Sequence, residues 1–273
     1  MKRILVTKAN GQLVPFDPNK VKSTCARAGA NRKFAKTIIR KIYPKLYDGI
    51  STREIYQYVL EFLESGERGK IIRHKYRLKE SIRLLGPSGF PFENFIARIL
   101  ENHGYQVLAL RKIVPGICVN HELDIIAHNS KLNRKYLIEC KYHNSPGILT
   151  GLKESLYTHA RFLDLKNDFD GEMLVCNTKV SSDVITYGRC INQKVISWRY
   201  PVNCGLEKMI EEKGLYPITI LGLSKKEITV FSQNDMMLAK DLLKYDTLYL
   251  TNQTGISKNR IDILKQTIEQ ILI

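Results

Sequence analysis

The sequence predicts a multidomain protein of the α + α/β class, with a mostly helical N-terminal domain, a central mixed β-sheet flanked by helices, and a helical C-terminal region. Three observations support this prediction. The chain has 273 residues, more than the ~100–200 residues of most single domains. Its charge is unevenly distributed. Its hydrophobic periodicity changes from helical to β-type and back to helical along the chain.

The excess positive charge is concentrated near the N-terminus. Residues 1–85 contain 20 Lys and Arg against 7 Asp and Glu, a net charge of +13, whereas residues 86–273 contain 23 against 20, a net charge of +3. A positive field on one domain indicates a polyanionic partner such as nucleic acid, nucleotide phosphates or an acidic membrane surface. The sequence Gly86-Pro87-Ser88-Gly89 then interrupts the helical pattern. We therefore predict three domains, at 1–86, 87–203 and 204–273.

The composition excludes several classes of protein. The chain is 44% apolar and 26% charged, as folded globular proteins are, so wholesale disorder is excluded. No apolar run approaches the ~20 residues that span a bilayer, and the N-terminal MKRILVTKANGQ lacks the apolar core of a secretory signal. The six cysteines form no CxxC pair and are too sparse for a disulfide scaffold. We expect a reduced, cytoplasmic protein without a membrane partner.

The first domain is expected to begin with a β-hairpin. Residues 3–8 and 13–16 are apolar runs on either side of Asn10-Gly11, the strongest short signal for a hairpin. Asp17 and Pro18 are favoured at the cap and the first position of a helix. Further amphipathic helices are expected near 33–46, 51–64 and 67–84.

The second domain alternates helices and strands. Pro91 begins a helix whose apolar residues recur at helical spacing, and Gly104 ends it. Met173-Leu-Val-Cys176 is a continuous apolar run, typical of a strand covered on both faces. The order of the elements predicts crossover connections and a mixed sheet. The expected strands are 105–110, 113–119, 123–127, 136–142, 173–176 and 195–198, and the expected helices are 149–166 and 182–191.

Helices dominate the third domain, and we detect no internal repeat in its sequence. The expected helices are 205–213, 235–243 and 258–272. The segment Thr254-Gly-Ile-Ser-Lys258 has two interpretations. It is either an ordinary capped helix start or a turn resembling a helix-hairpin-helix, in which Ser257 replaces the second glycine.

Three ionisable residues lie in otherwise apolar predicted strands. In Tyr136-Leu-Ile-Glu139-Cys-Lys141-Tyr, Glu139 and Lys141 share one face because strand side chains alternate. Placing an acid and an amine in an apolar strand is costly without a purpose. The preceding strand carries Asp124, which a hairpin would bring near Glu139. Two adjacent carboxylates repel each other, so either one is protonated or a cation bridges them.

We expect that cation to be Mg²⁺, with Mn²⁺ as a substitute, because Mg²⁺ takes a few carboxylates and keeps several waters. Such a metal stabilises charge on a phosphoryl oxygen and lowers the pKa of a bound water. Lys141 would orient or help deprotonate that water. Glu93 lies on the flank of an apolar helical stripe, from which it would complete the metal shell or polarise a water. The predicted metal ligands are Asp124, Glu139 and Glu93.

At these residues the sequence resembles the PD-(D/E)xK nuclease superfamily, and more narrowly its Mrr-like restriction-endonuclease branch. The matching segments are Phe92-Glu93-Asn-Phe-Ile, His121-Glu-Leu-Asp124-Ile-Ile and Ile138-Glu139-Cys-Lys141-Tyr, and the resemblance covers about residues 88–201. It implies a restriction-endonuclease-like sheet and an Mg²⁺-dependent endodeoxyribonuclease that hydrolyses phosphodiesters of DNA. Glu93, Asp124, Glu139 and Lys141 would be its catalytic residues.

The same residues leave other interpretations open. Glu139 and Lys141 could form a surface pair on an edge strand, with Asp124 in a turn. The domain could bind DNA without cutting it, as a nucleotide-responsive regulator. The same chemistry would also act on RNA or on branched DNA. Because cutting two strands commonly needs two active sites, we expect a homodimer.

Residues 4–82 resemble an ATP-cone, a nucleotide-sensing module, on the basis of Val14-Pro-Phe-Asp17, Lys20-Val21 and Ile50-Ser-Thr-Arg-Glu54-Ile55. The resemblance implies that ATP or another nucleotide is bound. Turn amides near Gly11, together with Lys8 and Lys20, would meet the phosphates. The family usually has Arg-Asp where this sequence has Ala9-Asn10. Two interpretations therefore stand side by side: the domain binds nucleotide, or it keeps the cone shape and uses its charge to hold DNA.

Overall fold

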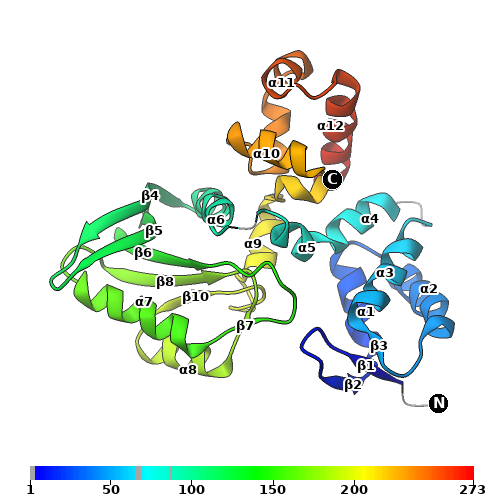
Figure 1. The fold of residues 1–273 in the computed structure, drawn as a ribbon, viewed down its shortest axis with the longest axis horizontal. Helices are drawn as coiled ribbons and strands as arrows, with labels where there is room; N and C mark the ends of the chain where they lie inside the picture. Colours follow the sequence, from blue (N-terminus) through cyan, green and yellow to red (C-terminus); the bar gives the residue numbers. More distant parts are fainter. Residues whose placement is uncertain (1–3, 66–68, 87) are drawn as a thin grey trace. The chain divides into compact units, whose positions relative to one another are not determined.

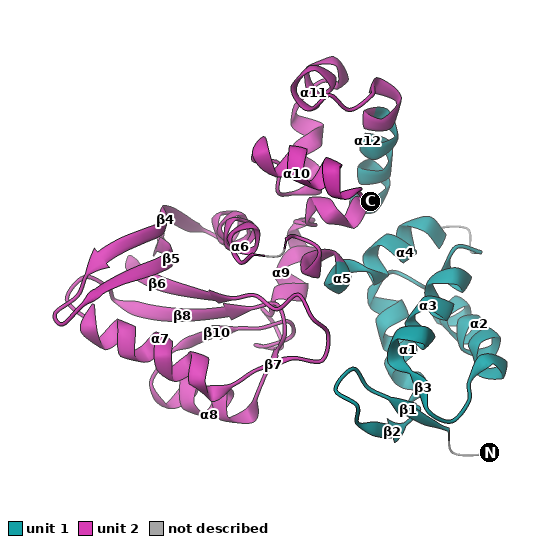
Figure 2. Cartoon of the chain, in the orientation of Figure 1, with its two compact units in different colours: residues 1–80, 262–273 teal, residues 81–261 magenta. Residues whose placement is uncertain are grey.

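The computed structural model describes residues 4–65, 69–86 and 88–273. The chain divides into two compact units, shown in Figure 2: unit 1 comprises Met1–Glu80 and Asp262–Ile273, and unit 2 comprises Ser81–Ile261. Residues 67 and 68 of the helix predicted at 67–84, and Pro87 of the predicted linker, lie outside the described residues. The division into three domains stays a prediction.

Unit 1 begins with the predicted hairpin. Strands β1 (Leu5–Thr7) and β2 (Leu13–Pro15) pair antiparallel, and β3 (Ile50–Ser51) pairs parallel with β1. Gly11 lies in the turn at φ +80°, a conformation that glycine adopts without a steric penalty. The expected hairpin is therefore confirmed.

Four helices follow among the described residues of unit 1 up to Tyr76. The predicted cap at Asp17 is confirmed, because its side chain accepts a hydrogen bond from the Asn19 amide. Asn31 and Ser51 cap the next two long helices in the same way. The helices, with one 3₁₀ turn, are α1 (Pro18–Arg27), α2 (Arg32–Ile42), η1 (Tyr43–Lys45), α3 (Thr52–Leu63) and α4 (Gly69–Tyr76).

The helix predicted at 67–84 is two helices. It is α4 followed by α5 (Leu78–Arg83), with a break at Arg77. The Arg77 amide donates to both the Arg73 and the His74 carbonyls, the tightened geometry of a helix end. The Arg77 side chain binds Glu80 at 3.1 Å. Apolar periodicity alone does not register such a break, because the apolar residues on both sides still face the interior.

The core of unit 1 is formed where the apolar faces of these helices meet β1 and β3. Ile38 and Ile42 of α2, Val59 and Leu63 of α3, and Ile50 of β3 are fully buried. The opposite face of α2 is exposed along its whole length. Figure 1 shows these elements in blue to cyan around one centre.

Unit 2 contains a five-stranded mixed sheet in the order β10-β8-β6-β5-β4 (Figure 1), as expected for the second domain. Strands β4 (Tyr105–Pro115), β5 (Asn120–Asn129) and β6 (Arg134–Lys141) are antiparallel, whereas β6, β8 (Gly171–Cys176) and β10 (Lys194–Ile196) are parallel. Every residue of β8 is buried, which confirms the prediction from its continuous apolar run.

One strand prediction was wrong. The run at 105–110 and the first residues of the run at 113–119 form the single strand β4, which ends at Pro115. The predicted gap between the runs is Arg111-Lys112, two charged residues that lie within the strand. A β-bulge shifts the register elsewhere in the same strand, between Val107 and Ala109.

Helices cover both faces of the sheet. Figure 1 shows α6 (Phe90–Asn102) on one side and α7 (Leu152–Asp164) with α8 (Ser182–Cys190) on the other. The predicted helix at 149–166 starts later because Leu149–Thr150 form β7, which pairs with β9 (Lys179–Val180). No helix among the described residues is long and apolar enough to span a bilayer.

The C-terminal part of the chain is helical, as predicted, but its elements differ. The expected helix at 235–243 is a 3₁₀ turn, and the helices over 225–233 and 247–254 were missed. The last helix is confirmed. The elements are α9 (Leu206–Lys213), η2 (Ile218–Leu221), α10 (Lys225–Gln233), η3 (Ala239–Lys244), α11 (Thr247–Thr254) and α12 (Lys258–Leu272).

The structure also contains a repeat that the sequence hides. In both α9–η2 and α10–η3, a residue of positive φ follows within two positions of the helix end, and a 3₁₀ turn comes after it. That residue is Gly214 at +59° in the first copy and Asp235 at +54° in the second. Aspartate tolerates this conformation better than most residues do, so the geometry survives without the glycine. Reciprocal backbone bonds join the copies: Ile218 N to Met237 O and Ala239 N to Tyr216 O.

Candidate functional site

The sheet of unit 2 divides where β5 leaves β6. Their pairing runs from Asn129 and Arg134 as far as Ile125 and Ile138. Beyond that point β6 continues beside β8, and the Asp124 carboxylate accepts the Cys140 amide at 2.7 Å. The carboxylate thus takes the place of the missing strand partner. We call this place the fork.

Glu139 lies at the fork and is only 4% exposed. One of its carboxylate oxygens is 2.6 Å from Lys141 Nζ and the other is 2.6 Å from Arg161 Nη1. Arg161, on α7, also donates to the Glu122 carbonyl at 3.0 Å and to the Tyr157 hydroxyl at 2.6 Å. A carboxylate this deeply buried requires compensation, and here two cations provide it.

Glu93 approaches the fork from α6. It is 6% exposed and binds Arg111 Nη1 at 3.1 Å, while Arg111 also donates to Asn94 at 2.9 Å. The register of β4 and β5 places Arg111 opposite Asp124. Its backbone has φ +48°, which costs a non-glycine residue about 1 kcal/mol or more and is typical of functional sites. This conformation aims Arg111 at α6.

The three acids interact electrostatically. Burial, together with repulsion from Glu139 and then Glu93, raises the pKa of Asp124 to about 7. Burial also raises the pKa of Glu93, against the effect of Arg111. Burial alone would lower the pKa of Lys141, but the hydrogen bond and charge of Glu139 outweigh it, so the pKa is raised. The structure therefore brings together all four residues that the sequence selected for catalysis.

The donor chemistry of the fork fits a hard divalent cation, since carboxylate oxygens are the ligands that Mg²⁺ takes. The pKa of Asp124 is raised by burial first and then by the charges of Glu139 and Glu93, which Lys141 only partly offsets. However, no group of three or more His, Cys, Asp or Glu side chains within the described residues is arranged as a metal cage. Glu139 would have to release Arg161 to join one, because both of its oxygens already bind cations.

Two histidines near the sheet have structural partners. His121, just before Asp124, binds Asp164 at 2.7 Å. The Asp164 carboxylate also accepts the Cys118 and Val119 amides at 2.7 and 3.2 Å and so holds the β4–β5 turn. His159 binds the buried Glu172 at 2.6 Å. Each imidazole therefore has a carboxylate partner, and no metal is needed to explain its position.

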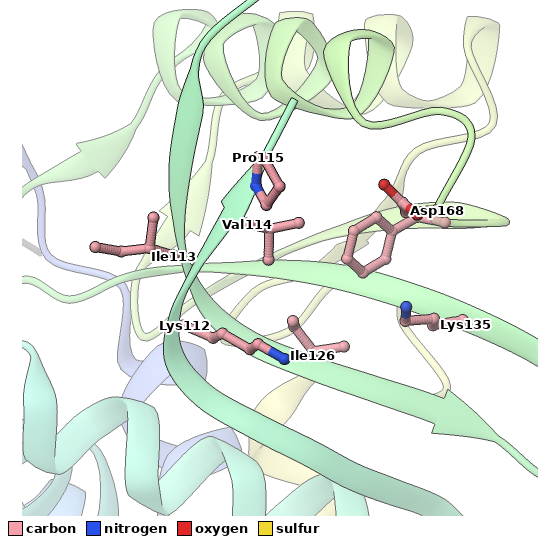
Figure 3. Close-up of a pocket in the computed structure, with 8 residues that line it drawn as sticks. Lys112, Ile113, Val114, Pro115, Ile126, Lys135 and Asp168 are labelled. Atoms are coloured by element: carbon pink, nitrogen blue, oxygen red, sulfur yellow. The ribbon is translucent and has the colours of Figure 1, made fainter. Parts of the chain in front are cut away.

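A small cleft of about 210 Å³ lies farther along β4, β5 and β6, near the loop that follows α7 (Figure 3). Val114, Pro115 and Ile126 give it apolar walls, and Lys112, Lys135 and Asp168 contribute charge. One of its lining residues, Ile126, is two positions from Asp124 along β5. It was not predicted from the sequence.

The predicted nucleotide-binding residues lie in unit 1. Gly11 N donates to Lys8 O at 2.9 Å and Gln12 N to the Asn10 side chain at 3.2 Å, so these two turn amides are occupied within the turn. Lys8 Nζ binds the Gln12 side chain at 2.9 Å, and Lys20 lies exposed in α1. Since these two amides are engaged, the predicted contacts to a phosphate that remain are those from the side chains of Lys8 and Lys20.

Sequence reasoning missed two arginines and a tyrosine at the fork. Tyr157 and Arg161 are four residues apart, so they share one face of α7, and the guanidinium lies 4.3 Å from the tyrosine ring centroid. That spacing was a usable signal. Arg111 offered none, because only the positive φ and the strand register bring it to Glu93.

Comparisons with known proteins find a matching family at each end of the chain. Residues 4–79 match the ATP cone domain, so the chain carries an ATP-cone domain at its N-terminus. Residues 216–272 match the family described as AF1548-like, C-terminal. An uncharacterized protein from Archaeoglobus fulgidus is 40% identical over 149 residues, which are 54% of this chain and 83% of the relative.

A solved structure is similar over a longer stretch. The crystal structure of the protein of unknown function AF1548 is 34% identical, with a TM-score of 0.59, and the match covers 68% of this chain and 98% of that one. The C-terminal family model and this nearly complete coverage of AF1548 agree. The chain therefore belongs to the AF1548-like family.

Proposed function

We propose that the chain is a metal-dependent DNA endonuclease of the PD-(D/E)xK type, whose activity responds to a nucleotide bound by the ATP-cone domain. The observation that supports the nuclease is the convergence of Asp124, Glu139, Lys141 and Glu93 at the fork. Their types and order along the chain match the motif of those nucleases. The ATP-cone match supports the response to nucleotide.

Each residue of the fork has a distinct task in this proposal. Asp124, Glu139 and Glu93 would hold a divalent cation, which supplies charge stabilisation at a phosphoryl oxygen and a more acidic bound water. Lys141, fixed by Glu139 at 2.6 Å, orients the attacking water and offsets charge that develops on the phosphate. Arg161, once it is released from Glu139, is free to bind a phosphate oxygen.

Plasmid nicking tests the nuclease. Supercoiled DNA incubated with the full chain should be nicked in Mg²⁺ and left intact in EDTA. Asp124→Asn and Lys141→Ala should each lower the rate by at least about 10³-fold, in the range found when essential catalytic groups are removed. Asp183→Asn, at an exposed position in α8, is the matched control and should cleave at the normal rate. Undiminished cleavage by both fork variants would refute the site.

A second candidate function is a nucleotide-responsive regulator that binds nucleic acid without cutting it. The double neutralisation of Glu139 by Lys141 and Arg161 favours it, because a carboxylate so engaged does not need a metal. In that case the plasmid stays intact in Mg²⁺ and Mn²⁺, while binding to DNA persists. RNA and branched-DNA substrates belong in the same assay, since the chemistry at the fork would act on any phosphodiester.

Thermal unfolding tests the nucleotide. A ligand that binds the folded state alone raises the melting temperature in proportion to the logarithm of its concentration. Millimolar ATP should therefore stabilise the chain. Lys8→Ala with Lys20→Ala should reduce that shift, and Lys131→Ala, an exposed lysine of unit 2, should leave it unchanged. An equal shift in the double variant would exclude these lysines as phosphate contacts.

A further inference from the structure

The outer surface of unit 1 contains a helix with an unusual charge pattern. Helix α2 exposes five cations and has no Asp or Glu, and α1, which packs beside it, has none either. From Pro18 to Ile42 the chain has eight Lys and Arg and no acid. We call the exposed cations of α2 the basic face; they are Arg32, Lys33, Lys36, Arg40 and Lys41.

Several described carboxylates of unit 1 have partners outside this face. Glu64 binds Arg73 at 2.9 Å, Glu61 lies 3.6 Å from Lys45, and Glu54 accepts hydrogen bonds from Tyr47 and Tyr58. No ion pair within the described residues involves a member of the basic face. Within the described residues the charge of this face is therefore not paired with an acid; Lys41 Nζ lies 3.4 Å from Ser65 Oγ and 5.4 Å from the Phe62 ring centroid.

Part of the pattern opposes the stability of the helix itself. Arg32 and Lys33 occupy the first turn, where the helix dipole favours anions, whereas Arg40 and Lys41 occupy the last turn, where the dipole favours cations. Arg32, Lys36 and Arg40 are spaced four residues apart, and like charges at that spacing destabilise a helix. A helix face that only had to be solvated could carry acids as well as cations. The arrangement instead favours a function for the cations.

The spacing and the surroundings of the face indicate its partner. With a rise of 1.5 Å per residue, the five cations span about 13 Å, which is comparable to the ~12 Å width of the major groove and reaches several phosphates. A membrane surface fits less well, because binding there requires a free apolar face. The apolar face of α2, with Ala35, Ile38 and Ile42, is buried in the core of unit 1.

We propose that the basic face of α2 binds the phosphate backbone of duplex DNA. The choice of duplex DNA rests on the function proposed above. In this arrangement unit 1 contributes affinity without sequence preference, because contacts to phosphate carry no base information. The ATP-cone domain would then hold the substrate as well as sense nucleotide.

The test measures DNA binding by the full chain as a function of salt. A fluorescent 30-base-pair duplex is titrated in EDTA, so that no cleavage interferes, between 50 and 300 mM salt. The five-fold variant replaces every residue of the basic face by Gln. Each neutralised phosphate contributes about 0.9 to the slope of log K against log salt, so the slope should fall by about 3 to 4. Because the two binding constants converge near 1 M salt, this change of slope lowers the affinity at 50 mM salt by on the order of 10⁴-fold.

A matched control removes the same charge elsewhere. The exposed lysines of unit 2 that do this, each replaced by Gln, are Lys131, Lys166, Lys208, Lys225 and Lys226. The control slope should change by less than about 1. Arg32→Lys with Arg40→Lys keeps the charge and should keep the slope. Melting curves verify folding, and the Gln variant should melt no lower than the natural chain because its like charges are gone.

Three results would overturn the proposal. They are an unchanged slope in the basic-face variant, an equal loss in the unit 2 control, and binding to phosphatidylserine vesicles in preference to the duplex. Plasmid cleavage in Mg²⁺ is scored separately. A chain that still cleaves but binds DNA independently of α2 keeps the proposed function and loses the surface, whereas a chain that binds through α2 without cleaving loses only the nuclease.

Discussion

The two units of the chain use ionisable residues in opposite ways. In unit 1 the cations of α2 lie at positions where the helix faces solvent, and neither α1 nor α2 contains an Asp or Glu. In unit 2 Glu93 and Glu139 are 6% and 4% exposed, and cations contact both. Water compensates charge at a surface, whereas charge inside a sheet must be compensated by neighbouring side chains. A surface charge can therefore attract a partner from solution, whereas a buried charge interacts with a ligand that enters its site.

The largest expected change in unfolding free energy comes from breaking the buried ion pairs of Glu139, and an exposed Glu–Lys pair of unit 1 serves as the comparison. Glu139→Gln leaves Lys141 and Arg161 without their anion, so the unfolding free energy should fall by about 2–4 kcal/mol, near the cost of breaking a buried pair. Glu61→Gln breaks the exposed pair with Lys45 and should cost less than about 1 kcal/mol. Denaturant unfolding of both variants measures the difference. An equal loss of unfolding free energy in the two variants would mean that burial does not make the ion pairs of Glu139 more important for stability than the exposed pair of Glu61.

A smaller effect of opposite sign is expected at Asp124. Its charge is buried and repelled by Glu139 and Glu93, so Asp124→Asn should raise the unfolding free energy by about 1–2 kcal/mol in EDTA at pH 8. The same variant should lose cleavage. Melting temperatures with and without Mg²⁺ provide the measurement, since added metal should stabilise only the natural chain. A variant less stable than the natural chain in EDTA would contradict the repulsion.

The smallest effect is a pH dependence at the β4–β5 turn. The hydrogen bond from His121, with those from the Cys118 and Val119 amides, lowers the pKa of Asp164 to about 2. An acid with a lowered folded-state pKa stabilises the fold above its unfolded value, here 3.8, and that stabilisation is lost as the pH falls through the folded value.

Unfolding midpoints of Asp164→Asn at pH 7, 5 and 3 test this dependence. The deficit of the variant relative to the natural chain should be full at pH 7 and 5 and should shrink below pH 4. Asp168→Asn, in the exposed loop after α7, is the control and should show no such trend. A deficit that stays constant down to pH 3 would show that the turn is held by contacts other than the charged carboxylate.

Much of the fold followed from local signals in the sequence. Asp17-Pro18 predicted the start of α1, Asn10-Gly11 predicted the hairpin, and the apolar run at 173–176 predicted the buried strand β8. Each signal depends on residues adjacent in the chain. The failures involve long-range or irregular geometry: the continuation of β4 through Arg111, the interruption at Arg77 and the 3₁₀ turn η3. The spacing of apolar residues is the same in these irregular segments as in regular helices and strands, so it does not reveal them.

The candidate site divides in the same way. The sequence selected Asp124, Glu139 and Lys141 because charges in apolar strands stand out, and it selected Glu93 from its place on a helical stripe. It could not select Arg111, which reaches Glu93 only through a left-handed backbone conformation. It also did not foresee that Arg161 binds the second oxygen of Glu139, because α7 meets β6 only after the crossover folds back.

By itself the sequence determined where the charges lie, which segments are apolar enough to be buried, and which residues could carry chemistry, since these properties belong to single side chains and their near neighbours. Tertiary structure decided how Asp124 enters the split between β5 and β6, which cations accompany Glu139, and where the turn amides of the ATP-cone domain direct their hydrogen bonds. The reason is physical. Compensation of a buried charge depends on distances of a few ångströms between residues far apart in the chain, and only the packed fold sets those distances.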